Sequence, residues 1–234
     1  ETEKLTYAED VGNEVRLATT DGKPTSIGSV IFETAQQASD IYGASFTTTG
    51  SAPAAFLARN WHPVSAMELG MKPSSFAVSA STYQFTHGVF LKRTVEAHDV
   101  IGVSLNDAVC SVETGLVEGQ RTLSITFKGS DPPVKVFGDL ADWYYDLTGK
   151  TAEYYAKYKE VVDAIKDYLS DNLGSFDRIL VSGHSLGGAM VQHFVSDLAN
   201  WNASVAGMIE GFTYGSIGAG ATTSGAVGRL TNFA

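Results

Sequence analysis

Cysteine is almost missing from this chain, because Cys110 is the only one among 234 residues. A single thiol rules out an intrachain disulfide and a metal site built from cysteines. Since Cys110 lies in a run of alternating apolar residues, we expect a buried structural thiol rather than a nucleophile. No spacing typical of metal ligands appears either, so the residues themselves predict no metal and no cofactor.

Basic residues and long apolar stretches are also scarce. Lysine and arginine number 16 against 26 aspartates and glutamates, which gives a formal net charge of −10. With no basic block, the sequence argues against nucleic acid as a partner and against electrostatic docking on anionic membranes. No stretch approaches the roughly 18 apolar residues of a transmembrane helix, and the first residues lack the basic and apolar regions of a signal peptide.

The remaining composition is typical of a globular protein. Hydrophobic residues make up 44% of the chain and charged residues 18%. The length allows one α/β domain or two small domains with a large core. Predicted strands alternate with predicted helices, which indicates an α/β protein with a mostly parallel sheet and helices on both faces.

The predicted elements are read from hydrophobic periodicity and turn residues. Strands are predicted at 14–18, 29–32, 100–105, 108–112, 122–127, 179–181, 208–215 and 229–233. Turns are predicted at 21–24 and at Asn106–Asp107, and Glu118-Gly119-Gln120 precedes the strand at 122–127. Helices are predicted at 34–42, at 53–60 and at 151–169, where apolar side chains recur at helical spacing.

The most informative segment is residues 179–190, which read Ile-Leu-Val-Ser-Gly-His-Ser-Leu-Gly-Gly-Ala-Met. Its apolar start suits a buried strand, and the pattern G-x-S-x-G follows. This turn lifts a nucleophilic serine, here Ser185, from a strand end onto a helix N-terminus. Gly183 and Gly187 are needed because larger side chains would collide with the neighbouring strand and helix. The alternative, a glycine-rich turn with an incidental serine, does not explain the order of strand, turn and helix.

A nucleophilic serine also needs a general base and donors for the oxyanion. One donor in this arrangement is the backbone N–H of the next residue, Leu186. For the second we expect the backbone N–H of Ser130, because Gly129 would let the preceding strand end approach the substrate. Taken alone, that segment reads as an ordinary strand-end turn. We expect His184 to support the serine backbone rather than to act as the base.

Longer segments resemble class 3 lipases. Residues 126–130 and 138–147 resemble the family's "F-R-G-T/S … D-W … D-L" segment. Residues 182–188 are similar to its serine turn, and residues 212–220 resemble the "F-G-S-P-x-x-G" strand and loop. Residues 61–70 resemble a segment of the bacterial RTX-type lipases. The resemblance covers about residues 55–233, with Lys128 in place of Arg and Ile217 in place of Pro.

The resemblance implies an α/β-hydrolase fold and a serine carboxylic-ester hydrolase that acts on acyl esters or lipids through an acyl-enzyme. Lipase, phospholipase A1 and feruloyl esterase remain open. It favours a secreted protein, with a cytoplasmic one left open. Calcium is implied only by the likeness to RTX-type lipases. Residues 142–146 and 54–58 are either lid elements or ordinary packed helices.

In this fold the triad follows the order Ser, Asp, His. After Ser185 the only candidates are Asp197 and His193, which the helix would point away from the serine. We therefore expect residues 51–234 to be the front part of a hydrolase domain, preceded by a β/helical extension at 1–50. A companion C-terminal segment or chain would then carry the Asp and His. The alternative is a catalytically incomplete hydrolase-fold protein with a binding or scaffold role. The upstream histidines are expected to be surface or core residues: His62, His87 and His98.

Overall fold

The computed structural model describes residues 7–11, 14–18, 26–43, 61–71, 83–98, 102–129, 150–219 and 229–233. Its strands are β1 (Tyr7–Val11), β2 (Glu14–Ala18), β3 (His62–Pro63), β4 (Tyr83–Thr86), β5 (Val89–His98), β6 (Gly102–Val117), β7 (Gln120–Phe127), β8 (Arg178–His184), β9 (Ile209–Tyr214) and β10 (Leu230–Phe233). Its α-helices are α1 (Ser26–Asp40), α4 (Thr151–Tyr155), α5 (Lys159–Asn172), α6 (Leu186–Trp201) and α7 (Ala203–Met208). The described residues also include the 3-10 turns η1 (Ile41–Gly43), η2 (Ala156–Tyr158) and η3 (Leu173–Ser175).

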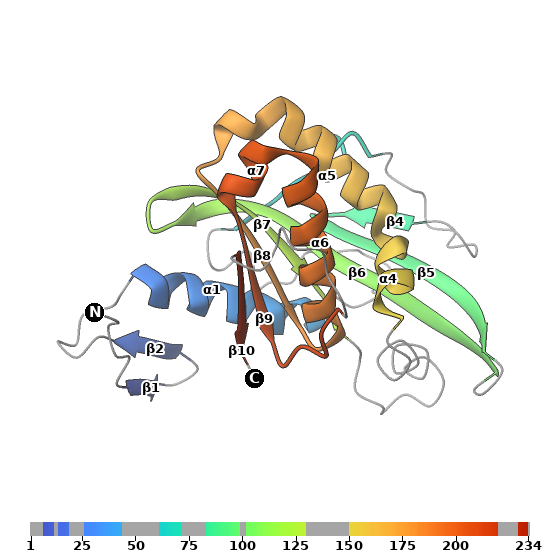
Figure 1. The fold of residues 1–234 in the computed structure, drawn as a ribbon, viewed down its shortest axis with the longest axis horizontal. Helices are drawn as coiled ribbons and strands as arrows, with labels where there is room; N and C mark the ends of the chain where they lie inside the picture. Colours follow the sequence, from blue (N-terminus) through green and yellow to red (C-terminus); the bar gives the residue numbers. More distant parts are fainter. Residues whose placement is uncertain are drawn as a thin grey trace.

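A mixed sheet of eight strands forms the centre of the molecule (Figure 1). Its order is β10-β9-β8-β7-β6-β5-β4, with β3 paired to β6. Strands β7 to β10 are parallel neighbours, whereas β4 to β7 pair antiparallel. The predicted α/β-hydrolase class is confirmed, and the candidate serine follows a strand of the parallel half. The division of the chain near residue 50 stays a prediction.

Helices cover both faces of the sheet, as the sequence predicts. Leu180 and Phe212 belong to a buried cluster with Val30 and Ile41 of the α1 segment. Adjacent residues of a strand point to opposite faces of the sheet. Ile179, the neighbour of Leu180, therefore belongs to the larger buried cluster, which includes residues of α4, α5, α6 and α7. Within the ranges that the structure describes, no helix has both the length and the apolar character needed to cross a membrane.

The predicted strand at 29–32 is wrong, because these residues belong to helix α1. Their β-branched side chains favour a strand locally, but the buried residues lie at helical spacing. Val30, Thr34, Ala38 and Ile41 are all at most 5% exposed and face the sheet. Packing against the sheet therefore overrides the local preference. The predicted strand at 14–18 is confirmed as β2, and its antiparallel partner is β1.

The predicted turn at Asn106–Asp107 is also wrong. Both residues lie inside the unbroken strand β6, where Asn106 pairs with Thr94 and Asp107 with Arg93 of β5. This part of β6 extends beyond β7, whose pairing with β6 begins at Cys110. Pairing with β5 therefore overrides the local turn preference of these two residues. The reversal comes later, at Glu118 and Gly119, which have positive φ angles of 56° and 78°.

The predicted helix at 151–169 is confirmed as α4, η2 and α5 in succession. All the side chains expected on its buried face are buried: Tyr154, Tyr158, Val161, Val162, Ile165 and Leu169. Phe127 of β7 contacts Tyr158 edge-on at 5.0 Å between ring centroids, and it also contacts Phe194 of α6 at 5.4 Å. Cys110 is fully buried beside this layer, and burial raises the pKa of its thiol. The expected burial of this thiol is confirmed.

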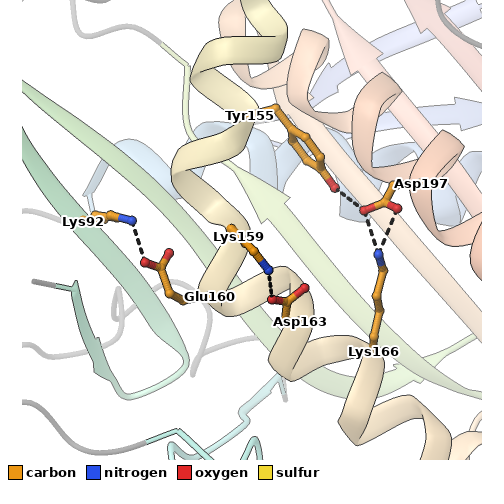
Figure 2. A network of polar contacts seen from close by, with 7 residues as sticks. All are labelled: Lys92, Tyr155, Lys159, Glu160, Asp163, Lys166 and Asp197. Atoms are coloured by element: carbon orange, nitrogen blue, oxygen red, sulfur yellow. Dashed lines mark hydrogen bonds and ion pairs between the residues drawn. The ribbon is translucent and has the colours of Figure 1, made fainter. Parts of the chain in front are cut away.

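Polar contacts outside the apolar core also connect α4, α5 and α6 with one another and with β5 (Figure 2). Glu160 of α5 pairs with Lys92 of β5 at 2.6 Å. Lys166 of α5 pairs with Asp197 of α6 at 2.8 Å. Asp197 also accepts a hydrogen bond from the hydroxyl of Tyr155, at 3.2 Å. Helix α5 is thus joined both to the antiparallel half of the sheet and to the helix that follows the candidate serine.

This packing predicts a sharp contrast between two positions of α5. Ile165→Ala should lower the free energy of unfolding by about 2–5 kcal/mol, because it removes a fully buried side chain and leaves a cavity. Asp167→Ala, at an exposed position of the same helix, should change it by no more than about 0.5 kcal/mol. Urea unfolding at neutral pH measures both values. Equal effects of the two changes would contradict the packing of α5 on the sheet.

Candidate active site

Ser185 lies between the end of β8 and the start of α6. Its φ and ψ angles are 55° and −124°, and a positive φ is uncommon for a residue with a side chain. Its backbone N–H donates to the carbonyl of Tyr214 at 2.9 Å, and its carbonyl accepts from the N–H of Gly188 at 2.9 Å. The serine is therefore held at the carboxyl ends of adjacent parallel strands, in the strand–turn–helix that the sequence predicts.

The two glycines of the pattern are required by close contacts. A Cβ at position 183 would lie 2.5 Å from the carbonyl carbon and oxygen of Gly187. A Cβ at position 187 would lie 2.3 Å from the carbonyl oxygen of Phe127, at the end of β7. Neither distance is possible for a real side chain, so the serine turn and the end of β7 can meet only through glycine.

The backbone around the expected oxyanion site is tightly packed. Leu186 is buried and is the first residue of α6. Its N–H belongs to the first turn of the helix, where backbone N–H groups have no acceptor within the helix. Gly129 follows β7, and a Cβ there would lie 2.3 Å from the carbonyl oxygen of His184. The end of β7 therefore touches the serine turn. Ser130 lies outside the described residues, and its role as second donor stays a prediction.

His184 contacts a residue that the sequence reasoning missed. Its Nδ1 lies 3.0 Å from the hydroxyl of Tyr42 in η1. The two rings meet edge-on, with centroids 6.0 Å apart. Tyr42 follows the last buried residue of the α1 segment, Ile41, but it carries no motif that would have marked it. Only the docking of the N-terminal helix on the sheet brings it to the serine turn.

The remaining described histidines are engaged or exposed elsewhere. His193 Nε2 lies 3.0 Å from the Thr151 hydroxyl, and the ring stacks on Tyr155 at 5.4 Å. Asp197 pairs with Lys166, as Figure 2 shows. The side chains of His62 and His87 are exposed, whereas the side chain of His98 is not among those described. Across the described side chains, no hydrogen bond joins a histidine to Ser185.

Helix α6 also holds the loop that follows β9. The side-chain amide of Gln192 donates to Ser216 at 3.3 Å, and its oxygen accepts from the N–H of Ala219 at 3.0 Å. Ser216 lies against α6, since a Cβ on Gly188 would come within 2.7 Å of it. Gln192 is a second residue that the sequence reasoning missed, although it follows Ser185 by two helical turns on α6.

Metal ligands are not grouped in the described part of the chain. No three side chains of histidine, cysteine, aspartate or glutamate lie there in positions that could hold a metal ion. The predicted lid candidates at 54–58 and 142–146 lie outside the described residues, as does the predicted helix at 53–60. Calcium remains an implication of the sequence resemblance.

Comparison with known proteins agrees with this geometry. Residues 107–223, which are 117 of the 234 residues, match the family described as Lipase (class 3). The chain belongs to the class 3 lipase family. This match includes the end of β7, the serine turn, α6 and the loop after β9. No curated protein matched the chain.

The fold of this chain is similar to that of a solved lipase. The extracellular lipase LipA from Serratia marcescens is 20% identical with a TM-score of 0.50, over 76% of this chain and 28% of that one. A deletion mutant of the Rhizomucor miehei lipase, in a propeptide complex, is 20% identical with a TM-score of 0.37, over 56% and 41% of the two chains. The chain therefore spans 28% of LipA and 41% of the Rhizomucor lipase. At this identity the likeness to LipA concerns the fold alone.

The close approach at Gly187 predicts the effect of one added methyl group. Gly187→Ala should lower the free energy of unfolding by about 1–3 kcal/mol, because its Cβ would overlap the end of β7. Gly207→Ala in α7 has no atom within 4 Å of the new Cβ and should be neutral or stabilising by up to about 1 kcal/mol. Thermal unfolding of both variants tests this contrast. An unchanged midpoint for Gly187→Ala would show that the turn and β7 do not touch.

His193 predicts a pH dependence of stability. Burial lowers the pKa of His193 in the folded protein. Unfolding therefore takes up a proton as the pH falls below the ordinary imidazole pKa of about 6.5, and stability should decrease in that direction. His193→Gln should reduce the difference in unfolding free energy between pH 7.5 and 5.5, measured in urea. The control His62→Gln, at an exposed position, should keep the difference. An unchanged difference in His193→Gln would contradict the assignment.

Proposed function

We propose that this class 3 lipase chain carries the nucleophile of a carboxylic-ester hydrolase, and that the nucleophile is Ser185. The supporting observation is the position of Ser185, alone between β8 and α6 with a φ of 55°. Such a turn lifts the hydroxyl out of the sheet, and the helix that follows directs its positive end toward the reacting group. The half-buried side chain of Ser185 is consistent with access by a substrate.

The proposed reaction proceeds through an acyl-enzyme. The hydroxyl oxygen of Ser185 attacks the acyl carbon while its proton passes to a general base. The N–H groups of Leu186 and Ser130 stabilise the oxyanion of the tetrahedral intermediate. The carbon–oxygen bond to the alcohol then breaks, and the alcohol leaves with the proton. Water attacks the acyl-enzyme in the same way and releases the carboxylic acid.

We propose that the base and acid come from a companion segment or chain outside the described residues. His184 forms a hydrogen bond with Tyr42, and His193 forms one with Thr151. Asp197 forms an ion pair with Lys166. Among the described side chains, none of these three forms a hydrogen bond with the hydroxyl of Ser185. The order of the triad in this fold, with the acid and then the histidine after the serine, supports the same arrangement.

The proposed substrates are acyl esters, with lipids as the favoured class. This rests on the lipase family and on the likeness in fold to LipA, which is an extracellular lipase. On the same basis we propose that the protein acts outside the cell. Calcium, which the resemblance to RTX-type lipases implies, has no part in the proposed steps.

A fluorophosphonate probe should label Ser185 in the complete protein. Ser185→Ala should abolish labelling and lower the hydrolysis of a p-nitrophenyl ester by at least about 10³-fold, since the nucleophile is removed. Ser175→Ala, at an exposed position, should leave both unchanged. Labelling of another serine would overturn the assignment of the nucleophile. A complete protein with neither labelling nor turnover would instead support the binding or scaffold role.

A further inference from the structure

The hydroxyl of Tyr42 meets three parts of the serine site at one point. It lies 3.0 Å from Nδ1 of His184, the residue before the candidate nucleophile. A Cβ on Gly129 would come within 2.4 Å of the same hydroxyl and within 2.3 Å of the His184 carbonyl oxygen. The end of β7, the end of β8 and η1 are therefore in direct contact. Tyr42 is the member of this group that comes from outside the sheet.

The position of Tyr42 is set by several hydrogen bonds of helix α1. Thr34 lies 2.8 Å from the hydroxyl of Tyr214 in β9, and that hydroxyl donates to the carbonyl of Ile31 at 3.0 Å. One turn later, Gln37 accepts a hydrogen bond from Ser124 of β7 at 2.8 Å. These bonds connect α1 to two strands and fix its rotation and its position along the sheet. Tyr42, which lies just after α1, is thereby placed against His184 rather than in solvent.

A buried cation, Lys128, also lies beside the ring of Tyr42. Lys128, the residue before Gly129, is 8% exposed, and its Nζ lies 5.8 Å from the centre of the Tyr42 ring. Such an approach is favourable between an ammonium group and an aromatic face. The ring is thus in contact with the end of β7 while its hydroxyl reaches the end of β8. Tyr42 therefore links the two strands whose following residues supply the proposed oxyanion donors.

We propose that Tyr42 is a positioning residue for ester hydrolysis, which holds the His184 imidazole and the end of β7 so that both oxyanion donors face one point. This inference rests on the proposed function. Tyr42 acts through His184 and Gly129 and does not contact the reacting atoms. Small displacements of such donors reduce transition-state stabilisation more than substrate binding. Loss of the hydroxyl should therefore lower kcat and leave KM nearly unchanged.

Tyr42→Phe in the complete protein is the primary test. It keeps the ring beside Lys128 and removes only the hydroxyl. We expect kcat for a short-chain ester to fall about tenfold, as for the loss of one hydrogen bond, with KM within about twofold of wild type. Tyr155→Phe is the matched control, because it also removes one tyrosine hydroxyl and its hydrogen bond, here to Asp197 and away from the serine turn. It should reduce the melting temperature to a similar extent while keeping kcat.

Substitutions of His184 test whether Tyr42 acts through it. His184→Leu should lower kcat, and adding Tyr42→Phe should cause no further loss, because the interaction is already absent. His184→Asn keeps an acceptor near the former Nδ1 and should restore part of kcat only when Tyr42 carries its hydroxyl. Additive losses in the double variant would show that the two side chains act independently and would overturn the proposal.

The remaining outcomes separate this proposal from the proposed function. A wild-type kcat for Tyr42→Phe, or an equal loss of kcat for Tyr155→Phe, would overturn the positioning role. A change in KM alone would make Tyr42 a substrate contact instead. If Ser185→Ala keeps full activity, the proposed function fails at its nucleophile. If Ser185→Ala is inactive and Tyr42→Phe is normal, only the role of Tyr42 fails.

Discussion

The site depends on a backbone contact that leaves no room for side chains. The end of β7, the serine turn and the first turn of α6 approach so closely that positions 129, 183 and 187 can hold only glycine. This contact brings Ser185 and the N–H of Leu186 next to the end of β7. It also fixes the strained backbone of Ser185, because hydrogen bonds to β9 and α6 hold it on both sides. The strands, the helices and the aromatic core keep this contact in place.

The two faces of the sheet support the contact in different ways. On one face, Phe127, Tyr158 and Phe194 form a close aromatic layer with α5 and α6. On the other face, α1 combines apolar residues with buried polar ones, such as Thr34 and Gln37. Apolar burial supplies most of the packing energy but tolerates small shifts, whereas hydrogen bonds require defined positions. The polar face of α1 therefore determines where Tyr42 lies relative to the serine turn.

The class 3 lipase family match covers the part of the chain that builds the serine site. The matched residues, 107–223, contain β7, β8, α6 and β9, on which the serine site is built. Helix α1 lies outside that match but docks on the same strands. The chain spans 28% of the length of LipA, and the candidate nucleophile and the backbone around it lie within the described residues.

The sequence by itself determined the α/β class, the strand–turn–helix around Ser185 and the long helix before it. These features depend on local periodicity and on glycines at fixed offsets, which are visible along the chain. Tertiary structure alone decided that residues 29–32 are helical and that Asn106 lies inside a strand, because packing and strand pairing overrode local preferences. It alone brought Tyr42 to His184 across 142 positions of sequence. No local pattern encodes such a contact, since it follows from how α1 docks on a sheet that other segments build.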